Sequence, residues 1–271
     1  MQPTSLAEIA SRPMGERTQH APGTFSWADL STTDQDGAKA FYGGLFGWQA
    51  QDLPVDENTV YSMQLIDGKA VAAISPQPAQ QREAGVPPLW NSYITVASAD
   101  DAAAQAGELG GTVHAPPFDV MDAGRMAVIQ DPTGAFFMVW EPRATIGAER
   151  VNAPGALCWN ELATPDFGAA QAFYGGLFGW TFDAFEGSEM PYHTIKNGEA
   201  NNGGMRTPQP GEPPNWLVYF GTEDTDASLA QVQEGGGSAL GPAMDLPMGR
   251  IGIARDPQGA TFALYAGQLE P

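Results

Sequence analysis

The sequence has few basic residues and almost no cysteine. It contains 12 Lys and Arg against 32 Asp and Glu, which gives a formal net charge of −20. Such a chain repels phosphate backbones and anionic membranes, which argues against nucleic-acid binding and electrostatic membrane attachment. A lone cysteine, Cys158, rules out an intrachain disulfide framework and a cysteine-rich zinc site. We expect Cys158 to be a small buried hydrophobic side chain.

Long apolar runs are also missing. No segment approaches the length that crosses a bilayer, and residues 1–20 carry charges without the apolar stretch of a signal peptide. We therefore expect a cytoplasmic protein with no membrane partner. The 271 residues are 42% hydrophobic, enough for two domains of ordinary size, each burying its own core.

What the sequence does contain is an internal repeat. The octapeptide FYGGLFGW of Phe41–Trp48 returns unchanged as Phe173–Trp180. Its flanks repeat too: SWADL and CWNEL upstream, and GR with DPTG or DPQG downstream. A fixed period indicates duplicated architecture. We expect an N-terminal arm (1–23), a first domain (24–143), a linker (144–155) and a second domain (156–271).

The octapeptide closes a helix. Ala38, Phe41, Tyr42 and Leu45 fall at the i, i+3, i+4 and i+7 positions of one apolar stripe, and the second copy has the same pattern. An aspartate that suits the N-cap precedes each helix, and a glycine that suits a left-handed C-terminal cap follows it. These capping residues are Asp34 and Gly47, and Asp166 and Gly179.

Strand patterns surround both helices. Residues 25–32 alternate as a strand, three short strands follow the helix, and 99–109 predict a second helix. A final hairpin crosses DPTG at 131–134, which we take as a four-residue loop. Each half thus reads as a βαβββ module taken twice, an α+β fold with two curled mixed sheets. Residues 5–12 predict a short helix outside the repeat.

This combination of motifs resembles the vicinal oxygen chelate superfamily, which includes glyoxalase I, extradiol dioxygenases and fosfomycin- and bleomycin-resistance proteins. The resemblance covers both halves and is greatest to bacterial two-domain glyoxalase-like proteins, some of which are described as kinase-binding regulators. It implies that paired modules curl into a U-shaped sheet whose concave face holds the ligand and, in the enzymes, a divalent metal.

The resemblance also places three metal-ligand positions in each half. They fall on Trp27, Asn91 and Met138 in the first half, and on Trp159, Leu217 and Ala263 in the second. None is a histidine or a carboxylate, and these side chains do not supply the donors that a divalent cation needs. We therefore expect no metal, no cofactor, and none of the metal-dependent chemistry of glyoxalase I, the dioxygenases or the thiol transferases.

Other side chains then line the concave face. Residues two apart on a strand share a face, so Asp29 accompanies Trp27, and Glu161 accompanies Trp159. By the same count Tyr93 lies beside Asn91 on the inward face. Tyr219 lies beside Leu217 in the same way. Each concavity is expected to hold a tryptophan, an acid and a tyrosine.

The four-residue loop sets the register of the last hairpin. It places Arg125 opposite Trp140 and on the face of Met138, and Arg250 opposite Tyr265 and beside Ala263. An inward acid and an inward arginine suggest mutual neutralisation, because an unpaired buried charge is costly. The pair is either a structural ion pair, a ligand contact, or an acid–base couple.

Two further groups leave alternatives open. The aromatic side chains either fill the core or stack on a flat ligand. Asn201 and Asn202 either line the second pocket or form a turn. The three histidines occupy none of the mapped positions, so surface or loop roles are expected for His20, His114 and His193.

Three functions fit these residues. The first is a metal-independent binder that sequesters a small, planar organic metabolite. The second is a metal-free tailoring enzyme that performs a cyclisation, isomerisation or hydrolysis, with Asp29 or Glu161 as the acid–base group. The third is a regulator that acts through a protein partner. Ligand-induced quenching of tryptophan fluorescence, loss of turnover in Asn and Gln variants, and capture of a partner would distinguish them.

Overall fold

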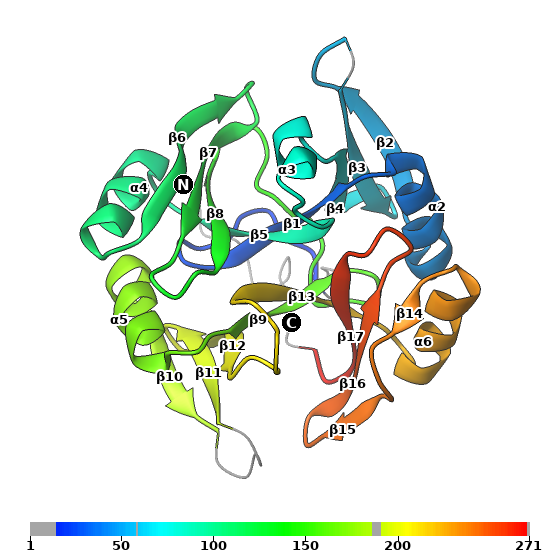
Figure 1. Cartoon of the computed structure of the whole chain (residues 1–271). Helices are drawn as coiled ribbons and strands as arrows, with labels where there is room; N and C mark the ends of the chain where they lie inside the picture. Colours follow the sequence, from blue (N-terminus) through cyan, green and yellow to red (C-terminus); the bar gives the residue numbers. More distant parts are fainter. Residues whose placement is uncertain (1–14, 58, 186–190, 270–271) are drawn as a thin grey trace, which may run out of the picture.

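The structure is a computed structural model that describes residues 15–57, 59–185 and 191–269; the helix expected over 5–12 lies outside these ranges. Within them, the chain forms two mixed sheets side by side (Figure 1). The strand order is β2-β3-β4-β1-β5-β8-β7-β6 in the first sheet and β10-β11-β12-β9-β13-β17-β16-β14 in the second, where β15 also pairs with β16. The α+β class and the tandem modules are confirmed.

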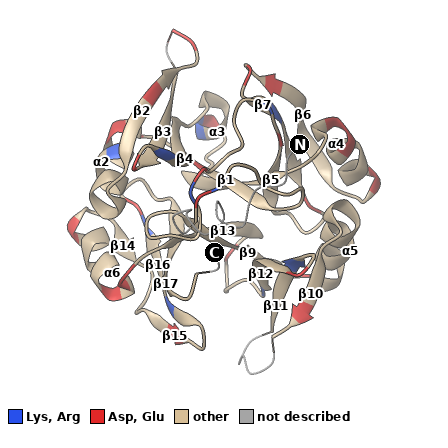
Figure 2. Ribbon diagram, turned by 180° about the vertical axis from the view of Figure 1, so that it is seen from behind, with Lys and Arg blue, Asp and Glu red and all other residues tan. Residues whose placement is uncertain are grey.

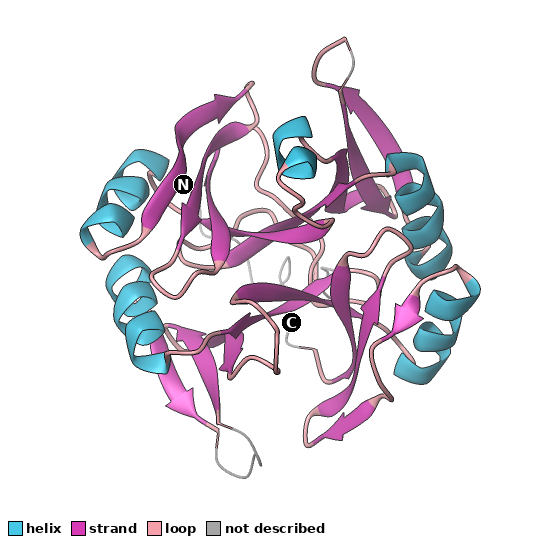
Figure 3. Cartoon of the chain, in the orientation of Figure 1, coloured by secondary structure: helices cyan, strands magenta, loops and turns pink. Residues whose placement is uncertain are grey.

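The two halves share most of their elements in the same order, but α3 has no counterpart in the second half, and β14 and β15 stand in place of β6 (Figure 3). The elements of the first half are β1 (Phe25–Thr32), α2 (Gln35–Phe46), β2 (Gln49–Pro54), β3 (Val60–Ile66), β4 (Lys69–Pro76), α3 (Ala79–Glu83), β5 (Leu89–Thr95), α4 (Ala99–Glu108), β6 (Thr112–Val120), β7 (Gly124–Gln130) and β8 (Phe136–Pro142). Those of the second half are β9 (Leu157–Ala163), α5 (Phe167–Phe178), β10 (Thr181–Ala184), β11 (Tyr192–Asn197), β12 (Ala200–Arg206), β13 (Asn215–Gly221), α6 (Thr225–Glu234), β14 (Ser238–Ala239), β15 (Met244–Leu246), β16 (Gly249–Arg255) and β17 (Thr261–Gly267).

The helix ends follow the predicted capping residues. Asp34 and Asp166 each accept a hydrogen bond from the backbone N–H three residues on. Gly47 and Gly179 each adopt a left-handed conformation with a φ of 71°, which glycine accommodates without strain. Local chemistry therefore fixes where α2 and α5 begin and end, and the following tryptophan leads into the next strand.

The long helices pack across the boundary between the halves. Helix α2 lies against α6, and α4 against α5, as two pairs at opposite sides of the molecule (Figure 1). The Tyr42 hydroxyl of α2 donates to Asp256 in the β16–β17 turn at 3.1 Å. The Tyr174 hydroxyl of α5 donates to Asp131 in the β7–β8 turn at 2.9 Å. Each half thus anchors its helix on a turn of the other.

The hydrophobic cores are shared in the same way, which corrects the expectation of one core per domain. One buried cluster combines Trp48 and Trp90 of the first half with Phe220 and Phe262 of the second. A second cluster joins side chains such as Phe137 and Trp180. Because aromatic side chains bury the largest apolar areas, much of the hydrophobic stabilisation of each half depends on the other.

The last hairpin has a different register from the predicted one. Gln130 pairs with Phe136, so five residues rather than four lie in the first turn, and Arg255 pairs with Thr261 in the second. The Asp131 carboxylate accepts from the backbone N–H groups of residues 133, 134 and 135, which extends the turn. A shift of one residue moves every side chain of a strand to the opposite face.

Acidic residues predominate along the described chain (Figure 2). Red segments mark α4, α6 and several hairpins, whereas blue segments are few and scattered. Many of the cations are tied to these acids; Lys39, for example, pairs with Asp36 and Asp52. Among the described residues, no helix has the length and apolar character needed to cross a membrane.

Candidate functional site

Strand pairing brings the predicted tryptophan and tyrosine positions into one row in each half. Trp27 lies opposite Tyr93, which lies opposite Met138. In the second half Trp159, Tyr219 and Ala263 form the equivalent row. Directly paired residues share a face of the sheet. The six residues therefore define two equivalent concave surfaces, which we call the first trough and the second trough.

The acid of the first trough is held by neutral donors. Asp29 is 5% exposed. Its carboxylate accepts from Tyr93 at 2.7 Å, from Asn91 at 2.8 Å and from Tyr61 at 3.1 Å. Tyr61 in turn accepts from the Trp27 indole N–H at 2.9 Å. Burial raises the pKa of Asp29 above its usual value, and the three hydrogen bonds only partly oppose that rise.

The acid of the second trough has a cation. Arg206 donates from Nε to Glu161 Oε1 at 2.7 Å and forms two further bonds to Glu212, both of 2.7 Å. Burial pulls the pKa of Arg206 down, but the two carboxylates more than offset it and the net shift is upward. The hydroxyls of Tyr192 and Tyr219 also interact with Glu161, and burial raises the pKa of both.

The prediction that Arg125 and Arg250 face the troughs is wrong. Arg125 lies opposite Glu141 rather than Trp140, and Arg250 lies opposite Ala266 rather than Tyr265. The extra residue in each turn turns both guanidinium groups to the other face. There Arg125 bonds to Asp100 of α4 and to Asp119, and Arg250 bonds to Asp226 of α6 and to Asp245. The expected ion pairs with Asp29 and Glu161 do not form.

The first trough is filled by its own side chains. Trp27, Tyr93, Met138 and Trp140 are all buried and belong to one hydrophobic cluster. Met63, opposite Ala73, packs against the same cluster. Two methionines and two tryptophans thus occupy the space beside Asp29.

The second trough has smaller residues at the matching positions. Thr194 replaces Met63, Gly204 replaces Ala73 and Ala263 replaces Met138. A Cβ on Gly204 would collide with the Tyr192 hydroxyl. Trp159 remains partly exposed, whereas its counterpart Trp27 is buried. Loss of side-chain volume therefore leaves space in the second half.

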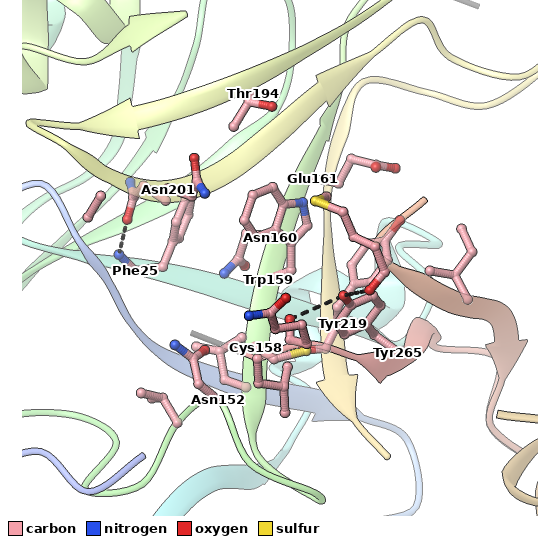
Figure 4. Close-up of a pocket in the computed structure, with 18 of the residues that line it drawn as sticks. Phe25, Asn152, Cys158, Trp159, Asn160, Glu161, Thr194, Asn201, Tyr219 and Tyr265 are labelled. Atoms are coloured by element: carbon pink, nitrogen blue, oxygen red, sulfur yellow. Dashed lines mark hydrogen bonds between the residues drawn. The ribbon is translucent and has the colours of Figure 1, made fainter. Parts of the chain in front are cut away.

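That space is a cavity of about 400 Å³. Figure 4 shows Trp159 near its middle, with Phe25 and Asn201 on one side and Tyr219 and Tyr265 on the other. Its lining also includes Cys158, Glu161, Tyr192 and Thr194 from the strands, Asn152 from the linker, Met248 from the β15–β16 hairpin, and Arg17 and His20 from the N-terminal arm. Burial raises the pKa of the Cys158 thiol, which therefore stays protonated.

Several residues in or beside the cavity were not predicted from the sequence. Arg206 lies beside the intermodule loop, and only its pairing with Tyr192 and its bond to Glu161 reveal its position. Arg17 and His20 lie in the arm outside the repeat, so no repeated motif marked them. His20 was expected in a surface or loop role; its Nε2 lies 2.7 Å from the Ala148 carbonyl and its ring lines the cavity. Asn201 and Asn202 belong to strand β12 and line the cavity. Of the two interpretations, a pocket lining is therefore correct and a turn is not.

The residues at the mapped ligand positions do not fit a divalent metal. Each row offers an indole, a phenol and an aliphatic or thioether side chain, and the neighbouring Asn91 is matched by Leu217. Across the described ranges no three histidine, cysteine, aspartate or glutamate side chains are grouped to hold an ion. A stable site for Mg²⁺, Mn²⁺ or Zn²⁺ needs several such donors in a closed geometry.

The sequence matches a known protein family in both halves. Residues 24–139 and 157–264 match the profile of the Glyoxalase/Bleomycin resistance protein/Dioxygenase superfamily. The chain belongs to this superfamily. Its curated members include the Mycobacterium tuberculosis (strain CDC 1551 / Oshkosh) protein named "Putative glyoxylase CFP32", 44% identical over 93% of this chain and 97% of that protein. The anthracycline biosynthesis protein DauV of Streptomyces sp. (strain C5) is 34% identical over 91% of this chain and 94% of its own length.

Solved superfamily structures share the fold at low sequence identity. The Mn(II)-bound glyoxalase from Novosphingobium aromaticivorans superposes with a TM-score of 0.66 at 16% identity, covering 92% of this chain and 83% of that one. A catechol 2,3-dioxygenase superposes with a TM-score of 0.62 at 13% identity, covering 93% and 90%. At such identities the superfamily relationship describes architecture, and function must be argued from the residues of the site.

Proposed function

We propose that this superfamily member binds a small, planar organic metabolite in the second trough without a metal ion. The observation that carries the proposal is the cavity of about 400 Å³ beside the partly exposed ring of Trp159. Cavities of roughly 300–1,000 Å³ with apolar walls and a few polar groups are typical small-molecule sites. Aromatic walls favour flat ligands, because offset stacking adds to the burial of apolar area.

The relatives suggest the ligand class. DauV and DnrV are named for anthracycline biosynthesis, and DnrV of Streptomyces peucetius is 33% identical over 91% of this chain. Anthracyclines are flat fused-ring compounds. A fused-ring aromatic metabolite is therefore the first class to test, in either a sequestering or a biosynthetic role.

The donor set supports a metal-independent site. Trp159, Leu217 and Ala263 stand where the resemblance places ligands, and Glu161 is already engaged by Arg206. An ion at this place would displace that cation and would gain only one carboxylate.

A metal-free enzyme is the second candidate, and one observation favours it. Glu161 lines the cavity and interacts with Tyr192 and Tyr219, so a carboxylate and two hydroxyls lie close to any bound ligand. Such groups transfer protons during cyclisation, isomerisation or hydrolysis. Asp29 also accepts hydrogen bonds from two tyrosines, but it lies in the filled first trough. We therefore propose Glu161 alone as the acid–base group.

Calorimetry and tryptophan quenching with a panel of fused-ring aromatics test the binding proposal. The protein is first treated with EDTA and then measured with and without added Mn²⁺, Ni²⁺ or Zn²⁺. We expect saturable binding at one site per chain that the metals do not alter. No binding across the panel, or binding that requires a stoichiometric metal, would refute the proposal. Turnover that disappears in Glu161→Gln while binding persists would favour the enzyme.

A further inference from the structure

The β15–β16 hairpin, which extends at the lower edge of the molecule in Figure 1, has two chemically different faces. Its residue pairs are Met244–Ile251, Asp245–Arg250 and Leu246–Gly249. Directly paired residues share a face and successive residues alternate, so Met244 and Leu246 lie on the face of Ile251, which lines the cavity. On the other face Arg250 bonds to Asp226 of α6 at 2.7 Å. The hairpin therefore directs apolar side chains toward the cavity and charged side chains away from it.

The tip of this hairpin borders the cavity but is left uncovered. Leu246, Pro247 and Met248, which we call the rim turn, all line the cavity. Leu246 is 44% exposed and Met248 is 58% exposed, and Met244 on the same hairpin is 48% exposed. Single exposed apolar side chains are common on protein surfaces, whereas a group of them at the edge of a pocket marks a contact surface. A molecule bound in the cavity would contact the rim turn and cover it.

The matching turn of the first half is tied to the chain that follows it. It spans residues 121–123, between the paired Val120 and Gly124. The backbone N–H groups of residues 143–145 bond to the carbonyls of Asp122 and Ala123 at 3.0–3.2 Å. Three backbone hydrogen bonds therefore hold this turn against its own half.

The rim turn is attached more loosely. Within the described residues, the C-terminal segment reaches it through two bonds to the Met248 carbonyl, one from the Tyr265 hydroxyl at 2.7 Å and a long one from Gln268 N at 3.4 Å. The ion pairs of Arg250 on the outer face lie at the surface, where such pairs contribute little. Segments with few buried contacts and few hydrogen bonds open most easily. The rim turn is thus a wall of the cavity that is able to move.

We propose that the rim turn closes on the ligand and covers its outward apolar edge, with Leu246 and Met248 as specificity-determining residues and Tyr265 as the residue that positions the turn. The second trough then gains affinity from apolar ligand surface that the strand residues alone would leave in water. This inference rests on the proposed function, since it names the residues that complete the same site.

Calorimetry of the full chain with anthraquinone, a flat apolar member of the fused-ring panel, tests the contribution of the rim turn. Leu246→Gln and Met248→Gln should each weaken binding about fivefold, as expected when roughly half of an apolar side chain is covered by the ligand. Met121→Gln is the matched control, because Met121 is 61% exposed in the corresponding turn of the first half, and it should bind as the wild type does. Wild-type affinity in both rim-turn variants would refute only this inference, whereas failure of the wild type to bind any compound of the panel would refute the proposed function.

The positioning role of Tyr265 has its own test. Tyr265→Phe keeps the ring in the cavity wall and removes the hydroxyl bond to the Met248 carbonyl. Stopped-flow tryptophan fluorescence should then show anthraquinone dissociating several-fold faster, as expected for the loss of one hydrogen bond, while thermal stability stays almost unchanged. Dissociation at the wild-type rate would contradict the positioning role.

Amide hydrogen exchange tests the closure in the wild-type protein, so it needs no variant to fold. Saturating anthraquinone should slow the exchange of amides in residues 244–249 several-fold, because a covered turn opens less often. Residues 118–124, the corresponding segment of the first half, should exchange at the same rate with and without the compound. Equal exchange of residues 244–249 in the free and bound protein would overturn the inference, even if the rim-turn variants bind more weakly.

Discussion

Asp29 and Glu161 occupy equivalent positions on β1 and β9, yet their surroundings give them different roles. The difference comes from one residue on the neighbouring strand. On β4, Ser75 pairs with Ser31, two residues beyond Asp29. Its counterpart on β12 is Arg206, which pairs with Ala163, two residues beyond Glu161. Without a cation, Asp29 is stabilised by neutral donors and burial raises its pKa. Glu161, by contrast, forms an ion pair with Arg206.

The pH dependence of stability should report on Asp29. In the unfolded chain its pKa returns to the usual 3.8, below the folded value. The folded protein then binds more protons, so the contribution of Asp29 to the free energy of unfolding falls as pH rises above 3.8, until the folded pKa is passed. Asp29→Asn lacks this term. We expect the stability of wild type relative to Asp29→Asn to decline with pH, by at most about 1.4 kcal/mol per unit.

Urea denaturation of both proteins between pH 4 and pH 8 measures this difference. Asp119→Asn is a suitable control, because that exposed carboxylate is paired with Arg125 and Arg143 and its pKa is lowered. Its relative stability should stay nearly constant over this range, because a carboxyl group with a lowered pKa changes the free energy of unfolding mainly below pH 3.8. A parallel pH response in wild type and Asp29→Asn would show that Asp29 does not hold its proton in the folded state.

A second residue-scale prediction concerns the buried tyrosine anchors. Tyr174 donates to Asp131 at 2.9 Å and accepts from the Trp216 indole at 2.8 Å. Tyr174→Phe leaves the Trp216 indole N–H and one carboxylate oxygen of Asp131 buried without these bonds, which costs roughly 1–3 kcal/mol. Chemical denaturation should show this loss. Tyr265→Phe, whose hydroxyl bonds lie at an exposed site, should change stability much less; equal losses would contradict the anchoring role.

At the scale of the elements, the sequence predicted the strands and helix caps but not the register of the last hairpin. Strand alternation is local, so once the family resemblance had placed Trp27 and Trp159 inward, the inward positions of Asp29 and Glu161 followed. The turn after β7 depends on how the Asp131 carboxylate binds several backbone N–H groups. That extra turn residue, invisible in the spacing, reversed the predicted direction of Arg125 and Arg250.

The contrast between the troughs gives an element-scale prediction. Thr194→Met places the side chain of the first trough in the second, so it should fill the cavity and weaken ligand binding at least tenfold. Stability should change little, because the methionine enters existing space rather than a packed core. Calorimetry and thermal unfolding measure the two effects. The reverse change, Met63→Thr, should lower stability without affecting binding; weaker binding in Met63→Thr would argue that the first trough also serves the ligand.

At the scale of the whole molecule, the two halves form one folding unit. The shared clusters and the anchors of Tyr42 on Asp256 and Tyr174 on Asp131 all cross the boundary. We expect residues 1–143 expressed alone to give no folded monomer, because α2 and β8 would lose the surfaces that they pack against. Circular dichroism with light scattering checks this. A cooperatively unfolding monomer of that length would contradict it.

The same interlocking limits what could be predicted about the site. The repeat indicated the architecture, and the aromatic rows followed from the positions that the family resemblance placed, extended by counting along strands. The sequence did not predict that Arg206, Arg17 and His20 lie at the site. Their positions depend on contacts between segments distant in sequence, such as the bond of His20 to Ala148. Tertiary packing, rather than local pattern, therefore decides which half has a cavity and what lines it.

The crossed tyrosine anchors leave the two hollows free to be altered separately. They bind turns on the helix side of the sheets, whereas Met63, Met138, Thr194 and Ala263 lie on the other side. Substitutions in the first trough could therefore create a second binding site while the site in the second trough stays unchanged. One chain would then bind two different compounds.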